Sequence, residues 1–155
     1  MKINDKAPDF LLKDKDGKEH SLSDVGDGYK VVYFYPKDNT PGCTFEARGF
    51  NKDLDRFRSM DTSIIGISGG NEETKEEFCD KNNLHLTLLS DSDFSVSNSY
   101  GVYGERRVFG KKLMGINRVT FILDKNNRII KIFDKIDPLK HSGEVLEYLG
   151  SIVRN

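Results

Sequence analysis

The chain has few cysteines, no surplus of charge of either sign and no long apolar run. Its 24 lysine and arginine residues are nearly balanced by 25 aspartate and glutamate residues. The resulting net charge of −1 gives no reason to expect nucleic acid or an anionic membrane as a partner. No apolar run approaches the roughly 20 residues that a membrane-spanning helix needs. The sequence also lacks internal repeats, low-complexity tracts and linkers rich in proline, glycine or serine.

The first ten residues, MKINDKAPDF, lack the apolar centre of a signal peptide. We therefore expect a cytoplasmic location, where thiols are kept reduced. The 2 cysteines are then expected to be free or redox-active rather than a structural staple. A length of 155 residues, 36% of them hydrophobic and 32% charged, suits a soluble protein with a single domain over residues 1–155.

Motifs of several functional classes are missing. The cysteines do not form C-x-x-C, which disfavours a thioredoxin-type reductase or isomerase. The histidines His20, His85 and His141 are too scattered for a zinc cluster, and we interpret them as surface or hydrogen-bonded polar residues. Gly69 and Gly70 precede an expected helix, as in a phosphate loop. Because neither G-x-x-x-x-G-K-[ST] nor G-x-G-x-x-G occurs, a simple glycine pair is favoured.

Short apolar runs predict the strands. They are Val31–Tyr35, Ile64–Ile67, Val119–Leu123 and Ile129–Phe133. The first has no polar interruption, as expected of a central strand buried on both faces. The last two flank the turn sequence KNNR and predict an antiparallel hairpin. Asp16-Gly17, between Phe10–Leu12 and His20–Leu22, predicts another hairpin near the start of the chain.

Helical patterns alternate with these strands. One follows Pro41, another covers Asn71–Asn82, and the last carries Val145, Leu149 and Ile152 at helical spacing. The order implies a mixed sheet with helices on both faces. We therefore predict an α/β protein with a thioredoxin-like fold, which has a mixed central sheet flanked by helices and an N-terminal β-hairpin. The basic stretch GERRVFGKKL is interpreted as a solvated loop.

Cys43 lies at the start of the first predicted helix. Thr40 is a good N-cap and Pro41 suits the first helical position, which places Cys43 in the first turn. With about 100° of rotation per residue, Cys43 is at the upstream end of an apolar stripe. That stripe contains Ala47, Phe50, Leu54 and Phe57. The sulfur should therefore point inward, and Phe45 should lie on the opposite side of the helix.

Opposing effects act on this thiol. Burial disfavours the thiolate and raises the pKa, whereas free amide groups and the positive end of the helix dipole lower it. The Thr40 hydroxyl could also donate to the sulfur. Position alone leaves two interpretations equally open, a nucleophilic thiolate and a small buried cysteine that only packs the helix.

The residues around Cys43 resemble the active site of peroxiredoxins. Pro36, Thr40 and Cys43 spell the motif P-x-x-x-T-x-x-C. The wider segment FYPKDNTPGCTFEA is similar to the bacterioferritin-comigratory-protein, or peroxiredoxin Q, branch. APDF, DVGDGYKVVYFYP and GKKLMGINRVTFILD extend the resemblance over nearly the whole chain. The last of these segments carries the second active-site residue of the family, an arginine, which is Arg118 here.

The resemblance implies a thiol peroxidase that acts on hydrogen peroxide and organic hydroperoxides. Cys43 would be the peroxidatic cysteine and would become a sulfenic acid. Arg118, Thr40 and the backbone amides of Gly42 and Cys43 would donate hydrogen bonds where negative charge develops. Glu46 matches a family position that orients the arginine.

The resemblance also assigns Pro36 the role of shielding the thiolate from bulk water. It implies thioredoxin, or a similar dithiol protein, as the electron donor and a monomer or weak dimer as the assembly. No metal, haem or flavin cofactor is implied, and neither nucleic acid nor a membrane is expected as a partner.

Most members of this branch have a resolving cysteine five residues after the peroxidatic one, where this chain has Arg48. Cys79, in the next predicted helix, is the alternative resolver, as in some members of the branch. Its helix, NEETKEEFCDKNN, is nearly all charged and has only Phe78, alongside Cys79, as an apolar anchor. Glu76 and Asp80 should raise the pKa of Cys79.

A Cys43–Cys79 disulfide needs the two Cα atoms within about 7 Å, so one or both helices would have to unwind. Gly49 should weaken the first helix by about 1 kcal/mol relative to alanine. Other interpretations remain open. In the first, Cys79 is a surface cysteine without a function. In the second, the enzyme uses one cysteine and another thiol donor. In the third, the chain is a non-catalytic binding or holdase module.

Overall fold

A seven-stranded mixed sheet organises the computed structural model, which describes residues 1–153. Its strands run in the order β2-β1-β5-β4-β3-β8-β9. In chain order these strands are β1 (Leu11–Lys13), β2 (Glu19–Ser21), β3 (Tyr29–Phe34), β4 (Thr62–Ser68), β5 (Thr87–Ser90), β8 (Val119–Leu123) and β9 (Ile129–Phe133). The predicted mixed sheet, with its N-terminal hairpin and its β8–β9 hairpin, is confirmed.

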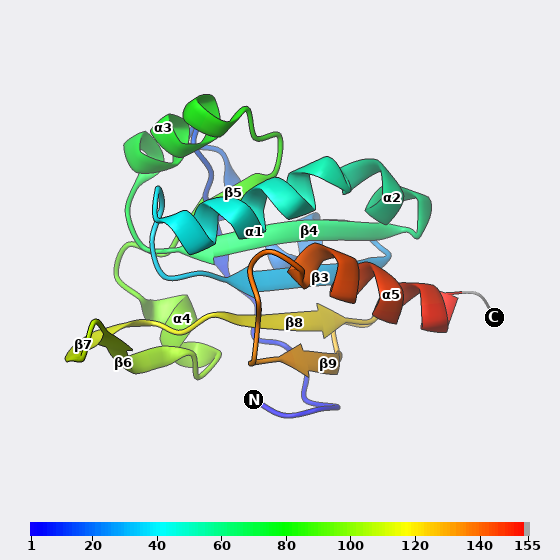
Figure 1. Cartoon of the computed structure of the whole chain (residues 1–155). Helices are drawn as coiled ribbons and strands as arrows, with labels where there is room; N and C mark the ends of the chain where they lie inside the picture. Colours follow the sequence, from blue (N-terminus) through cyan, green and yellow to red (C-terminus); the bar gives the residue numbers. More distant parts are fainter. Residues whose placement is uncertain (154–155) are drawn as a thin grey trace.

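In the described residues, five α-helices accompany the sheet (Figure 1). They are α1 (Pro41–Lys52), α2 (Leu54–Ser59), α3 (Glu72–Asn82), α4 (Ser95–Ser99) and α5 (His141–Val153). A short 3-10 helix, η1 (Leu22–Asp24), follows β2. Within the described part of the chain, none of these helices combines the length and the apolarity that a membrane crossing requires.

The two faces of the sheet carry separate hydrophobic cores. Tyr33 of β3 and Tyr35, which directly follows this strand, face α1, α3 and α5, where they join Phe50, Phe78 and Leu149 in a first core. Alternate residues of β3 and β4 face the second core, which includes Phe34, Ile65, Val96 and Tyr100. Side chains of a strand alternate between faces, so one buried apolar strand can serve both cores.

Strand pairing brings distant segments to one end of β3. β3 pairs in parallel with β4 and antiparallel with β8. In the second pair Phe34 lies opposite Val119 and Tyr33 lies opposite Thr120. Arg118 directly precedes β8, so it lies beside the segment that leads from β3 into α1. The register of this antiparallel pair therefore places Arg118 near the N-terminus of α1.

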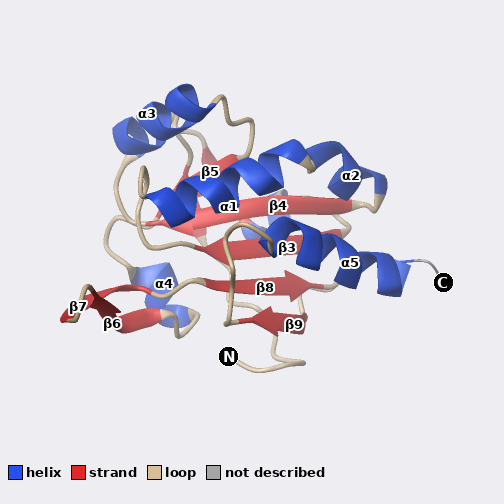
Figure 2. Cartoon of the chain, viewed as in Figure 1, coloured by secondary structure: helices blue, strands red, loops and turns tan. Residues whose placement is uncertain are grey.

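Two local predictions were wrong. The helix after Pro41 is not continuous, because Asp53 separates α1 from α2. Phe50 and Phe57 are fully buried, but Leu54 is only partly so. The basic stretch is not a loop but an antiparallel hairpin of β6 (Tyr103–Val108) and β7 (Lys111–Ile116). Figure 2 shows this hairpin as two strands outside the main sheet.

Candidate active site

Cys43 lies in the first turn of α1 and is only 1% exposed. Thr40 occupies the N-cap position with an extended backbone, as predicted. Its hydroxyl does not reach toward the sulfur, however, because it donates to the backbone carbonyl of Lys37 at 2.8 Å. The first amides of an α-helix have no acceptor within the helix. The N–H groups of Gly42 and Cys43 are therefore free to meet an anionic oxygen.

Arg118 connects Cys43 to Glu46. Its Nη2 lies 3.4 Å from the Cys43 sulfur, and its Nη1 donates to Glu46 Oε1 at 2.6 Å. A Cβ atom at Gly42 would lie 3.0 Å from Arg118 Nη2. The absence of a side chain at Gly42 thus leaves room for the guanidinium beside the sulfur. The structure brings Cys43, Glu46 and Arg118 together as the sequence predicted.

Glu46 is completely enclosed. Its Oε1 accepts from Arg118, but its Oε2 has no hydrogen-bond partner among the described residues. Burial raises the pKa of Glu46 to about 7, although Arg118 opposes this rise. A carboxyl group with this environment can hold a proton near neutral pH.

His141 lies behind Glu46, at the start of α5. It is fully buried, so of the two alternatives predicted for the histidines it fits the hydrogen-bonded one and not the surface one. Its Nε2 is 2.8 Å from Thr120 Oγ1 and 4.0 Å from Glu46 Oε2. Burial, followed by the charge of Arg118, lowers the pKa of His141 to about 4, so the imidazole is neutral at pH 7. The rings of Phe50 and Phe133 pack against it edge-on.

A buried ion pair ties α3 to the segment that leads into α1. Lys75 Nζ lies 2.8 Å from Asp38 Oδ2 and donates to the carbonyl of Gly69 at 2.6 Å. Tyr35 donates its hydroxyl to the other oxygen of Asp38 at 2.6 Å. The side chain of Lys75 is 0% exposed. The apolar anchors of α3 are Phe78 and Cys79, as predicted, and this ion pair adds a polar anchor that the sequence did not predict.

Cys79 also lies inside the protein, at 3% exposure, so its interpretation as a surface cysteine was wrong. Both cysteines are free thiols and belong to the first core. Burial is the main cause that raises the pKa of Cys79, with the charges of Asp38 and Asp80 acting in the same direction. The predicted direction is confirmed, but enclosure outweighs the neighbouring acids.

Pro36 is half-buried in the loop after β3. It lines a cavity of about 440 Å³ together with Asp38, Gly69 and Phe94. The helix that follows Gly69–Gly70 starts with a capping box, in which Asn71 and Thr74 satisfy each other's backbone amides. These contacts favour a structural glycine pair over a phosphate loop.

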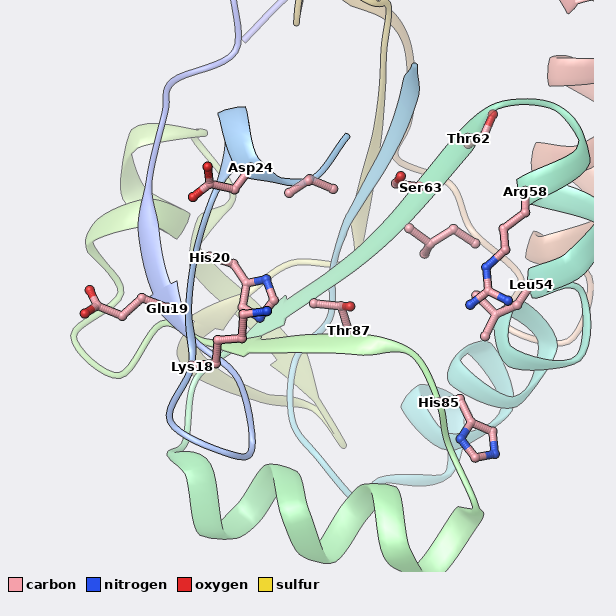
Figure 3. Close-up of a pocket in the computed structure, with 12 residues that line it drawn as sticks. Lys18, Glu19, His20, Asp24, Leu54, Arg58, Thr62, Ser63, His85 and Thr87 are labelled. Atoms are coloured by element: carbon pink, nitrogen blue, oxygen red, sulfur yellow. The ribbon is translucent and has the colours of Figure 1, made fainter. Parts of the chain in front are cut away.

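A larger cavity of about 490 Å³ lies away from these residues (Figure 3). Its lining includes His20 and His85, together with Thr62 and Ser63 at the start of β4. None of the residues discussed around Cys43 borders it. Among the described residues, no group of three histidine, cysteine, aspartate or glutamate side chains is placed to hold a metal ion.

Comparisons with known proteins agree with this geometry. The profile of the AhpC/TSA family matches residues 3–132. Peroxiredoxin Bcp of Bacillus subtilis is 41% identical over 149 residues, which are 96% of this chain and 95% of the relative. A putative peroxiredoxin bcp of Helicobacter pylori is 40% identical, covering 96% of this chain and 98% of its own.

Solved structures of similar proteins share the fold. A cysteine variant of PrxQ from Xylella fastidiosa superposes with a TM-score of 0.92 at 30% identity, covering 99% of this chain and 98% of the other. BcpB from Mycobacterium tuberculosis gives a TM-score of 0.87 at 32% identity, with 98% of each chain covered. The predicted thioredoxin-like architecture is thereby confirmed.

Proposed function

The chain belongs to the AhpC/TSA family of peroxiredoxins, and on this premise we propose that Cys43 is its peroxidatic cysteine. Peroxiredoxins reduce hydroperoxides at the expense of a thiol reductant. The observation that carries the assignment is the 3.4 Å contact between Arg118 Nη2 and the Cys43 sulfur at a helix N-terminus. A cation and free amide groups at this position favour a thiolate and the anionic transition state of its attack.

The proposal gives each residue of the site a separate role. The Cys43 thiolate attacks the terminal oxygen of the hydroperoxide, forming an S–O bond while the O–O bond breaks. Arg118 and the amides of Gly42 and Cys43 donate to the oxygens. Thr40 already donates its proton to Lys37, so its hydroxyl oxygen is positioned to accept from the peroxide O–H.

We propose that Cys79 resolves the sulfenic acid by forming an intramolecular disulfide with Cys43. The two thiols belong to the same core. Structures of Xanthomonas campestris peroxiredoxin Q include two single cysteine-to-serine variants at positions 36 residues apart, the same separation as that of Cys43 and Cys79. Because both thiols are buried within helices, resolution requires local unwinding of α1, α3 or both.

Intact-mass analysis after one equivalent of hydrogen peroxide tests both assignments. The expected product is a monomer that has lost two hydrogen atoms, with Cys43 and Cys79 peptides linked after digestion. In the Cys79→Ser variant, a sulfenic acid that reacts with dimedone should remain on Cys43. A stable oxidised Cys43 beside a free Cys79 in the wild type would contradict the resolving role and favour the one-cysteine alternative.

Gly49 provides a test of the unwinding step. An alanine Cβ at this position would lie 3.4 Å from Ser142 Cβ, an ordinary contact, so Gly49→Ala should fold normally. It should stabilise α1 by up to about 1 kcal/mol and slow disulfide formation by up to about fivefold. Rapid acid quenching with mass analysis measures the rate. Gly150→Ala in α5, where the Cβ would meet nothing within 4 Å, is the matched control and should leave the rate unchanged.

We further propose thioredoxin, or a similar dithiol protein, as the reductant and the cytoplasm as the location. Two free cysteines are consistent with a reducing compartment. A monomer or weak dimer is proposed from the family resemblance. Peroxide-dependent NADPH consumption coupled through thioredoxin and its reductase tests the reductant, with Cys43→Ser as the control. No consumption with an active, reduced enzyme would exclude thioredoxin.

A further inference from the structure

One guanidinium serves two acidic groups in an enclosed site. Arg118 contacts the Cys43 sulfur through Nη2 and Glu46 Oε1 through Nη1. Cys43 is 1% exposed, and the Glu46 side chain is 0% exposed. A thiolate and a carboxylate together would place two negative charges against this single cation, out of reach of water. Such an uncompensated charge is costly in a protein interior.

The other groups that face the site do not remove this imbalance. His141 on α5 is neutral because burial holds its pKa far below 7. The Tyr33 hydroxyl on β3 is buried and has no hydrogen-bond partner within residues 1–153, and this burial raises its pKa well above the usual value. Arg106 on β6 is close enough to interact with Cys43 and Arg118, but it is only partly buried. Its charge is therefore partly screened by solvent.

Oε2 of Glu46 gives a second reason to expect only one negative charge beside Arg118. An ionised carboxylate would leave Oε2 buried without a donor among the described residues, and the neutral His141 Nε2 lies 4.0 Å away, beyond hydrogen-bond distance. A protonated carboxyl carries no charge at this enclosed oxygen, so it avoids the cost of a buried anion without a donor. The surroundings of Oε2 thus suit a neutral Glu46 when Cys43 is a thiolate.

We propose that Cys43 and Glu46 share a single proton across Arg118, so that Glu46 stores the proton that the thiol loses and releases it when peroxide is reduced. This inference rests on the proposed role of Cys43 as the reacting thiol. Glu46 is a positioning and proton-storing residue in this scheme, because it contacts Arg118 rather than the substrate.

The proton balance of the oxidation step follows directly. The reduced site contains a thiolate, a neutral Glu46 and the Arg118 cation. The thiolate sulfur bonds to the terminal peroxide oxygen, the O–O bond breaks, and its electron pair leaves on the alkoxide. The alkoxide needs one proton, and the loss of one proton from Glu46 supplies it. The products are a sulfenic acid, an alcohol and an ionised Glu46 paired with Arg118, and the net charge of the site is unchanged.

Counting protons during a single turnover tests this scheme. The experiment uses the Cys79→Ser background, which stops at the sulfenic acid, in weak buffer with a pH indicator and one equivalent of tert-butyl hydroperoxide. The pH is chosen below 7, where thiolate absorbance shows that Cys43 is ionised. The proposal predicts no net proton uptake with Glu46 present. When Glu46→Gln is added to the Cys79→Ser background, the proposal predicts uptake of one proton per oxidised Cys43. Glutamine keeps the shape of the glutamate side chain but stores no proton.

Asp53→Asn is the matched control. Asp53 is a buried acid at the junction of α1 and α2 that accepts from Ser142 Oγ at 2.8 Å, and this substitution should leave the proton count at zero. Equal proton uptake with and without Glu46 would overturn the proposal. If Cys43 gains no oxygen atom by intact mass, the assignment of the reacting thiol fails instead, so the two failures are distinguishable.

Infrared difference spectroscopy tests the same proposal in protein that retains Glu46, so the result does not depend on whether Glu46→Gln folds. The oxidised-minus-reduced spectrum of the Cys79→Ser protein should show loss of the carbonyl stretch of a protonated carboxyl. The same loss should persist in Asp53→Asn. A spectrum without this loss, in protein whose Cys43 has been oxidised, would overturn the proposal.

Discussion

Replacing Arg118 with lysine should lower kcat/KM for hydroperoxides by about 10²–10³-fold, the cost of removing one preorganised donor from an anionic transition state. The guanidinium contacts the Cys43 sulfur and Glu46 through different nitrogens. A lysine ammonium is a point charge that cannot reproduce this fork, even though it keeps the positive charge. The loss should appear mainly in kcat of the oxidation step, because the donor acts where charge develops. Stopped-flow single-turnover kinetics provide the measurement.

Arg106→Lys on β6 is the control for this prediction. Arg106 acts on Cys43 only through its charge, and lysine retains that charge. Its effect on the rate should therefore be small. A less than tenfold loss in Arg118→Lys would contradict the requirement for two contacts from one side chain and leave its charge alone as the relevant property.

Breaking the buried pair between Lys75 and Asp38 should produce the largest loss of stability. Lys75→Met removes the cation but leaves Asp38 nearly enclosed, with a side chain only 6% exposed. Removing one partner of a buried pair typically costs about 3–5 kcal/mol in the free energy of unfolding. Urea denaturation, followed by circular dichroism, measures this change.

The same variant should accelerate disulfide formation, because Lys75 fastens α3 and thus Cys79 to the segment before α1.

The double variant Lys75→Met with Asp38→Asn separates the energy of the ion pair from the effects of each substitution on its other contacts. Without either charge, the interior has no unpaired ion, so the double variant should be less destabilised than the sum of the single variants. Lys81→Met, at an exposed position on the same helix, should change the free energy of unfolding by no more than about 0.5 kcal/mol. Additive single effects would show that the pair is not energetically coupled.

Among the strands of the main sheet, mostly apolar runs or a turn signal allowed prediction from the sequence, whereas the strands that lack both were missed. Val119–Leu123 and Ile129–Phe133 were predicted with their observed bounds, because each run is mostly apolar and a turn separates them. β5 has only four residues. β6 and β7 carry charged and exposed side chains, so neither shows the alternation typical of a half-buried strand. The sequence did not predict that Asp53 ends α1, because apolar residues continue at helical spacing on both sides of Asp53.

The same limit applies to the site. Thr40, Cys43 and Glu46 lie within one helical start, and motif resemblance identified Arg118. His141 and Lys75 could not be found in this way. Histidine and lysine become buried only when a partner is available, and their partners, Thr120 and Asp38, are remote in the sequence. Only the folded sheet brings these pairs together, so no local pattern signals them.

The assembly of the site from both halves of the chain has a consequence during translation. Cys43 leaves the ribosome well before Arg118 and the start of α5 have been made, because synthesis proceeds from the N-terminus. A nascent chain therefore carries a cysteine with no guanidinium beside it and no enclosure around it. Its sensitivity to oxidants is that of any unstructured thiol, and the reactivity that we propose for Cys43 requires Arg118 to have joined it.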